Sequence, residues 1–189
     1  MRSALRAIGA HFERDASLLE AQSAAHIELI RVRDEQQVAQ VRALFSEYAA
    51  QLGVSLCFQQ FDDELAQLPG VYAAPTGQLL LALVDGQPAG CGALRALPDA
   101  DYPDACEMKR LFVRRAFRRF GLGRQLAQAL LDQAVSAGYS TLLLDTLDDM
   151  EAARGLYASL GFEEVPPYYF NPLPGAHYLK VDLAHPARR

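Results

Sequence analysis

The stretch that decides the fold of this chain is KRLFVRRAFRRFGLGR at residues 109–124. Its apolar extended start ends at Val113, a basic turn follows, and Gly121 and Gly123 open an apolar helical pattern. The first amides of a helix lack acceptors within the helix, and the helix dipole places partial positive charge there. Because glycine lets an anion approach the backbone closely, this arrangement predicts a phosphate-binding site. The same residues also fit a helix that uses its glycines only for tight packing.

Other phosphate-binding motifs fit this stretch poorly. No Lys-Ser or Lys-Thr pair follows the glycines, as a Walker A loop requires, and Leu126 stands where a dinucleotide fingerprint needs a small residue. Seven of the 18 basic residues lie from Lys109 to Arg124, although the whole chain has a net charge of −5. Because the average is acidic and no helix-turn-helix pattern is present, we expect no nucleic-acid partner.

The composition narrows the class of protein. The 189 residues, 51% hydrophobic and 22% charged, are typical of one globular domain. The longest apolar run, at residues 79–84, is far shorter than the roughly 18 residues of a membrane helix. The first 25 residues contain no secretory core, and three widely spaced cysteines suit a reducing compartment. These features lead us to expect a cytoplasmic protein with no membrane partner. Because the sequence contains neither HExxH nor CxxC, we also expect no metal.

Hydrophobic periodicity on either side of residues 109–124 predicts an α+β domain with one mixed sheet. Strands are expected at residues 27–32, 79–84, 89–96, 106–113, 141–146, 162–165 and 177–183. Helices are expected at residues 34–53, 62–68, 121–137 and 151–160, and Asp85-Gly86 predicts a hairpin turn. The domain is expected to span residues 27–186, after an N-terminal helical extension of unassigned role at residues 1–26.

Two signatures in the right order resemble the GNAT family of N-acetyltransferases. RRFGLG at residues 118–123, after a strand, matches the family's pyrophosphate motif. ARGLYASLGF at residues 153–162 matches its second signature, and the likeness covers residues 27–183 by element order. Met150 stands where many relatives carry an Asn that helps to hold the cofactor. With its tail PPYYFNP at residues 166–172, the chain resembles uncharacterised small bacterial-type acetyltransferases of this family.

The resemblance implies a mostly antiparallel sheet flanked by helices, with splayed fourth and fifth strands that hold acetyl-CoA as co-substrate. An amine would attack the thioester directly, with no acyl-enzyme. The residues that would contact acetyl-CoA are Leu111, Phe112, Val113, Arg118, Arg119, Phe120, Gly121, Leu122, Gly123 and Arg124. Its 3′-phosphate would be neutralised by Arg114, Arg115, Arg119 or Arg124.

Three residues are candidates for catalysis. Tyr157 matches the family's general acid, which protonates the departing thiolate, although a helical tyrosine can also serve packing alone. Glu107 and Asp145 compete for the role of general base, because an acidic residue in an apolar strand is costly unless it is paired or functional. We prefer Glu107 because its strand also positions the thioester. The alternatives are an ion pair of Glu107 with Lys109 or Arg110, and a helix-proximal cap for Asp145.

The acceptor is the least constrained part of this interpretation. Tyr168, Tyr169 and Asn171 lie where the family's substrate-facing loop is found, and they would line a small amine pocket or only rigidify the loop. We expect transfer to a primary amine of a small molecule or amino acid. A peptide, protein N-terminus or lysine acceptor, and a non-catalytic acyl-CoA-binding module, remain as alternatives, and a homodimer is left open.

Overall fold

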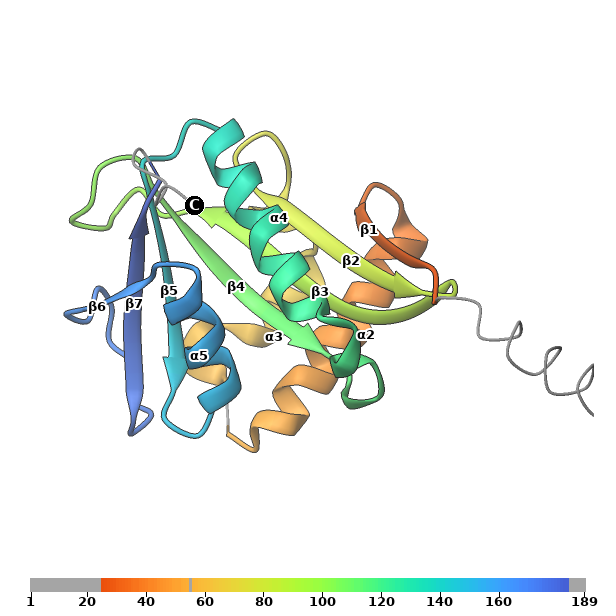
Figure 1. Cartoon of the computed structure of the whole chain (residues 1–189). Helices are drawn as coiled ribbons and strands as arrows, with labels where there is room; N and C mark the ends of the chain where they lie inside the picture. The colour runs from red at the N-terminus through yellow and green to blue at the C-terminus, as the bar shows by residue number, and fades with distance from the viewer. Residues whose placement is uncertain (1–24, 55, 184–189) are drawn as a thin grey trace, which may run out of the picture.

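The computed structural model describes residues 25–54 and 56–183. Within them, seven strands form one sheet in the order β1-β2-β3-β4-β5-β7-β6, with helices on both faces (Figure 1). The strands are β1 Ile27–Arg31, β2 Gln78–Val84, β3 Gln87–Ala96, β4 Ala105–Val113, β5 Thr141–Leu147, β6 Glu163–Val165 and β7 Ala176–Asp182. The helices are α2 Glu35–Leu52, α3 Phe61–Gln67, α4 Leu122–Ser136 and α5 Glu151–Ser159, with short 3-10 turns η1 Cys57–Gln59, η2 Gly70–Tyr72 and η3 Arg115–Phe120.

These elements confirm the expected ones to within one or two residues. The expected helix at residues 1–25 and the domain's last residues, 184–186, lie outside the described residues. None of the described helices is long and apolar enough to cross a membrane.

Local chemistry explains where several elements begin and end. The Asp34 side chain accepts a hydrogen bond of 2.8 Å from the Gln37 amide and so caps α2, which ends at Gly53 in the left-handed conformation. Asp85 and Gly86, between β2 and β3, have φ angles of 50° and 75°. Positive φ at both central residues is the geometry of a tight hairpin turn, as the Asp-Gly pair predicts.

The sheet opens between β4 and β5. These strands run parallel, and their pairing covers only residues 105–107 of β4 and 141–143 of β5. Beyond this point the two strands diverge (Figure 1), whereas the other neighbours among the described strands are antiparallel. The expectation of a mostly antiparallel sheet with splayed fourth and fifth strands is confirmed.

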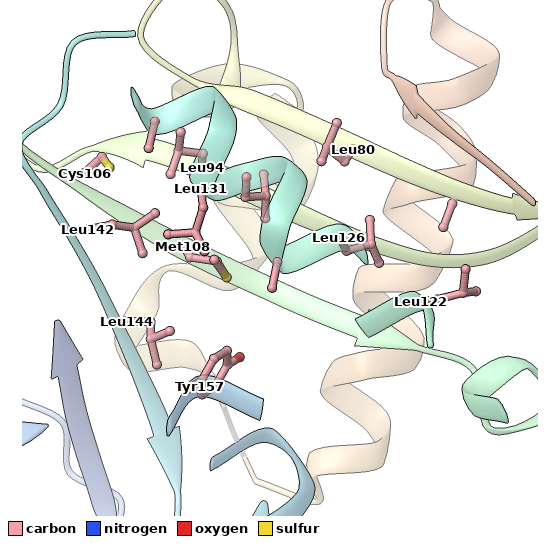
Figure 2. Packing of buried hydrophobic residues seen from close by; sticks show 14 of the residues in the cluster. Leu80, Leu94, Cys106, Met108, Leu122, Leu126, Leu131, Leu142, Leu144 and Tyr157 are labelled. Carbon is pink, nitrogen blue, oxygen red and sulfur yellow. The ribbon is translucent and has the colours of Figure 1, made fainter. Parts of the chain in front are cut away.

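Each face of the sheet carries its own apolar core. On one face, Leu126 and Leu130 of α4 pack with Met108 of β4 and Leu144 of β5, and Figure 2 shows Tyr157 of α5 beside Leu144. On the other face, α2 packs through Val41, Leu44 and Phe45 against a second cluster that includes Leu81, Ala93 and Phe112. The opening between β4 and β5 therefore lies between two packed layers.

A β-bulge lies in β4 beside this opening. The register with β3 shifts between Cys91 and Ala93, and Arg110 has a φ of 57°. As a result, Arg110 reaches Glu64 of α3 with two hydrogen bonds of 3.0 and 2.6 Å, while Leu111 packs into the core beneath α4.

Candidate active site

A pocket occupies the opening between the splayed strands, and we call it the gap pocket. Its two sides are residues 108–111 of β4 and 145–147 of β5. Tyr48 and Gln59 reach it from the α2 side, and Tyr157 reaches it from α5. Successive side chains of a strand point to opposite faces of the sheet, so Asp145 and Thr146 line the parts of the pocket that lie on the two faces. The pocket therefore connects both faces of the sheet.

Glu107 lies behind the gap pocket and does not line it. Its side chain is 0% exposed. One carboxylate oxygen accepts from Arg95 Nε and Nη2 at 2.7 and 2.6 Å, and the other accepts from the Tyr168 hydroxyl at 2.9 Å and lies 3.6 Å from Lys109 Nζ. The expected partner Lys109 is therefore present and Arg110 is not, whereas Arg95, on the neighbouring strand, was not foreseen.

Asp145 lines the gap pocket and its side chain is 16% exposed. Its Oδ1 lies 3.4 Å from Lys109 Nζ, and its Oδ2 accepts from the Tyr169 hydroxyl at 2.8 Å and from Asn171 Nδ2 at 3.5 Å. Glu107 of β4 pairs with Leu143 of β5. Two residues further along each strand, Lys109 and Asp145 are the next positions that face one another. Their side chains bridge the gap just where the backbone ladder has ended.

The loop between β6 and β7 brings Tyr168, Tyr169 and Asn171 to this network. The two tyrosine rings pack on each other and on Tyr178, with centroid separations of 5.3–5.5 Å. Burial, followed by the charges of Glu107 and Asp145, raises the pKa of Tyr168, and burial with Asp145 raises the pKa of Tyr169. Both phenols stay protonated at neutral pH and donate to the two carboxylates.

Tyr157 approaches the gap pocket from the opposite face of the sheet. It is 6% exposed, its ring lies 5.6 Å from that of Phe162, and Figure 2 shows it close to Leu144. Burial raises the pKa of Tyr157, so its hydroxyl carries its proton at neutral pH. No described residue forms a hydrogen bond with that hydroxyl, which leaves it free to donate to a bound group.

The basic turn leads from β4 into α4 as its sequence indicates. Gly121 has a φ of 66°, a left-handed conformation that favours glycine, and α4 begins at Leu122. The Gln125 amide donates to the Gly121 carbonyl, so the amides of residues 122–124 precede the first full turn of hydrogen bonds. The Leu122 side chain is buried in the core, and only its amide is available to a ligand.

The arginines around this turn divide into engaged and available side chains. Arg114 pairs with Glu47 of α2 and also donates to the Pro88 carbonyl. Arg124 donates to Ser159 Oγ at 2.6 Å, and Arg118 donates to the Val113 carbonyl at 3.1 Å. Arg119 is exposed, with its guanidinium 5.0 Å from the centre of the Phe120 ring, and Arg115 is exposed as well. Among the expected phosphate partners, Arg115 and Arg119 are the ones left available.

The three β4 residues that were expected to contact acetyl-CoA differ in where their side chains and backbone groups lie. Leu111 lines the gap pocket, whereas the Phe112 side chain is buried against α2, with its ring 6.0 Å from that of Tyr48. Phe112 and Val113 pair with β3 through their other backbone edge. Beyond Glu107, the β4 edge that faces β5 is outside the ladder, so its amides and carbonyls can bind an extended ligand.

Sequence reasoning missed Lys109, Gln59 and Thr146 as parts of the site. Lys109 carries a signal, because a charged side chain inside an apolar strand needs a partner. Gln59 and Thr146 carry none, because polar residues of their type are common in turns and strand ends and only the folded chain brings them to the pocket.

Comparisons with known proteins agree with this geometry. The sequence pattern of the acetyltransferase (GNAT) family matches residues 41–162. A Schizosaccharomyces pombe protein described as an uncharacterized N-acetyltransferase is 36% identical over 161 residues, which cover 85% of this chain and 97% of that protein.

Solved acetyltransferase structures share the fold. An acetyltransferase from Streptococcus agalactiae superposes with a TM-score of 0.68 at 20% identity, covering 82% of this chain and 98% of the other. A Salmonella typhimurium acetyltransferase, solved with its cofactor acetyl-CoA, superposes with a TM-score of 0.61 at 19% identity, covering 86% and 96%. Because the family pattern covers more than half of the sequence and the Schizosaccharomyces pombe relative matches most of it, this chain belongs to the acetyltransferase (GNAT) family and is an N-acetyltransferase.

Proposed function

We propose that the protein transfers the acetyl group of acetyl-CoA to the primary amine of a small molecule, by direct attack in a ternary complex. One observation carries this proposal. The gap pocket brings a carboxylate, Asp145, and a protonated phenol, Tyr157, to one space from opposite faces of the sheet. A thioester in the gap would have an amine activated on one side and its sulfur stabilised on the other.

The residues present fit acetyl-CoA. The unpaired backbone edge of β4 suits an extended pantetheine chain with its amides, and the first amides of α4 suit a pyrophosphate. Arg115 and Arg119, both exposed beside that helix start, offer positive charge to the 3′-phosphate. The Salmonella typhimurium structure of the same fold was solved with acetyl-CoA, which supports acetyl-CoA as the co-substrate here.

The reaction moves two protons off the acceptor nitrogen and one proton onto the sulfur. An alkyl ammonium with a pKa of about 10.4 must lose a proton before its nitrogen can attack the thioester carbon. We assign that proton to Asp145, because it faces the pocket and Glu107 does not. As the new C–N bond forms, the C–S bond breaks with its electron pair on sulfur, and the attacking nitrogen loses its second proton to solvent. Tyr157 then stabilises the thiolate, which becomes the thiol of CoA.

The raised pKa of Tyr157 bears on how it acts. A thiol has a pKa of about 8.5, well below that of this phenol. Complete transfer of the phenolic proton to sulfur would therefore be uphill. A hydrogen bond from the phenol to the departing sulfur stabilises the negative charge without that cost, and solvent can supply the proton afterwards.

A hydrogen bond between two segments that border the pocket favours a small acceptor. Gln59 Nε2 donates to the Tyr169 hydroxyl at 3.1 Å, which joins the turn after α2 to the loop between β6 and β7. An extended peptide needs an open trough between such walls, and this bond bridges them over the α2 side of the pocket. Asp145 and the Tyr157 hydroxyl also argue against a non-catalytic binding module, because cofactor binding alone requires neither group.

The test is acetyl-CoA consumption by the purified protein with small amines, amino acids and peptides as separate acceptor panels. The proposal expects turnover with small amines that exceeds turnover with any peptide. Faster turnover with peptides would assign the pocket to the peptide alternative. Tight binding of acetyl-CoA without turnover in any panel would leave a binding module.

A further inference from the structure

Given the proposed transfer to a small amine, we infer that the acceptor is an amine without a carboxylate group, and that Gln59 Oε1 accepts a hydrogen bond from it. Simple alkyl amines and amino acid amides belong to this class. Free amino acids, which carry a carboxylate next to the amino group, do not.

The first observation is a pair of unpartnered polar atoms. In the described part of the chain, the buried side-chain oxygens and nitrogens without a hydrogen-bond partner are Gln59 Oε1, Thr146 Oγ1 and Gln133 Oε1. Gln59 and Thr146 both line the gap pocket. Buried polar groups are nearly always satisfied, so two unpartnered oxygens at one pocket indicate a site for a polar ligand. The amide oxygen of Gln59 can only accept a hydrogen bond, whereas the Thr146 hydroxyl can donate or accept one.

The orientation of Gln59 assigns its free atom. Its Nε2 is used by the bond to the Tyr169 hydroxyl, and that hydroxyl is in turn used by Asp145. Reversing the amide would leave Nε2 without an acceptor and take the Tyr169 proton away from Asp145. The carbonyl oxygen of Gln59 is therefore the end that remains for a ligand, close to the carboxylate that receives the amine proton.

The second observation is the balance of charge around the pocket. Two cations line it, and each is already matched: Lys109 lies between Glu107 and Asp145, and Arg110 forms a bidentate pair with Glu64. The third nearby cation, Arg95, forms an ion pair with Glu107. Among the described residues that line the pocket, no positive charge is left over for an incoming carboxylate, and Asp145 would repel one.

An acceptor carboxylate would therefore lose its water without gaining a counter-ion, which is unfavourable inside a protein. An ammonium or amide group brings only the donors that Gln59 Oε1 and Asp145 can accept. The free acceptor of Gln59 and the charge of Asp145 thus favour a ligand that brings hydrogen-bond donors and positive charge, and they select against a carboxylate.

The experiment compares leucine with leucinamide and isoamylamine as acceptors at saturating acetyl-CoA. The two carboxylate-free compounds lie on either side of leucine in amine basicity, so a preference for both over leucine is not an effect of basicity. We expect kcat/KM for leucine to be at least about tenfold lower than for either one. Calorimetric titration of each compound into the protein–CoA complex gives the same comparison without turnover.

Three variants locate the preference. Gln59→Leu should raise KM for leucinamide about tenfold with a smaller change in kcat, because a ground-state hydrogen bond is lost. Gln59→Lys should narrow or reverse the discrimination against leucine by adding an unmatched cation. Gln133→Leu is the matched control, since it removes the unpartnered oxygen on α4 that does not line the pocket, and it should change neither constant.

The outcomes separate this inference from the proposed function. Equal or better use of leucine, or Gln59→Leu behaving like Gln133→Leu, overturns the inference while acetyl transfer stands. Gln59-dependent binding of leucinamide without acetyl-CoA consumption upholds the inference and contradicts the proposed reaction. If none of the three compounds binds, the inference is overturned.

Discussion

At the scale of single residues, the two carboxylates that the sequence placed in competition sit in different environments. Glu107 is fully buried and accepts from Arg95 and Tyr168, whereas Asp145 is partly exposed in the gap pocket. A general base must reach the proton that it removes, so geometry separates the two before their acidity does. Asp145 meets that condition, and Glu107 stabilises the cations behind it.

Exchange of each carboxylate for its amide should separate these roles. Asp145→Asn should lower kcat by roughly 10²–10⁴-fold, as expected for loss of a general base, with acetyl-CoA affinity nearly unchanged. Glu107→Gln breaks a buried ion pair and should destabilise the fold by roughly 3–5 kcal/mol. Kinetics and thermal unfolding on the same preparations check both. A normal melting temperature with lost turnover in Glu107→Gln would return the base to Glu107.

Tyr157→Phe removes one hydroxyl and keeps the ring that packs on Phe162. We expect kcat to fall roughly 10- to 100-fold, which corresponds to about 1.5–3 kcal/mol for a hydrogen bond to a charged sulfur. The melting temperature should stay near that of the parent, because no described residue bonds to the hydroxyl. Unchanged turnover in a folded variant would remove Tyr157 from the mechanism.

At the scale of elements, the start of α4 carries the proposed pyrophosphate site, and the turn before α5 contributes Met150 to the lining of the gap pocket. Gly121→Glu tests the helix start, because it places a carboxylate where the proposed pyrophosphate lies. The expected result is loss of detectable acetyl-CoA binding by calorimetry. Gly121→Asn is the matched control: it tolerates the left-handed conformation at 66° and adds no charge, so it should retain most of the affinity. Equal affinity in both variants would contradict this phosphate site.

The turn before α5 is held to β6 and β7 by His177. Its Nε2 lies 2.6 Å from Asp148 Oδ1, and its Nδ1 lies 2.7 Å from Glu164 Oε1. Hydrogen bonding to Asp148 and then Glu164 raises the pKa of His177, and the bond to His177 lowers the pKa of Asp148. When it is protonated, the ring donates to both carboxylates and ties the turn that carries Met150 to the neighbouring strands.

This clamp makes a signed pH prediction. A raised folded-state pKa means that the contribution of His177 to stability is complete below its unfolded pKa of about 6.5 and is lost as pH rises through the folded value. The difference in melting temperature between the parent and His177→Gln should therefore be larger at pH 6 than at pH 9. Asp148→Asn removes the largest cause of the shift and should reduce this pH dependence. A difference that grows with pH would contradict the clamp.

At the scale of the whole molecule, the opening between β4 and β5 divides the sheet into two parts. Beyond the short ladder, side chains such as Lys109 and Asp145 bridge them. A ligand that lies along the open backbone edge would add contacts to both parts. Bound acetyl-CoA should then stabilise the domain as a unit.

Thermal unfolding measures this effect directly. At a concentration of 100 times its Kd, acetyl-CoA should add about 2.7 kcal/mol, which raises the melting temperature of a domain of this size by roughly 5–10 °C. The shift should grow with ligand concentration and be absent from Gly121→Glu. A parent protein that melts at the same temperature with and without acetyl-CoA would contradict ligand binding in the gap.

Much of this architecture was predictable from local patterns. Helix α4, its glycine start and the Asp85-Gly86 hairpin follow from residues that are neighbours in the chain, because apolar periodicity and turn chemistry act over a few positions. The two signatures at residues 118–123 and 153–162 further indicated the family and the splayed strands.

The composition of the pocket was decided only by tertiary structure. Gln59 and Tyr169 are 110 positions apart, and Glu107 meets Arg95 through the pairing of β3 with β4. The bulge at Arg110 directs its side chain to Glu64. A bulge interrupts the alternation of side chains along a strand, so the sequence pattern does not predict this contact. The sequence therefore determined the elements and the kind of chemistry, since both depend on local backbone preferences. Which carboxylate faces the pocket and which is consumed by ion pairs depends on long-range packing, which only the folded chain defines.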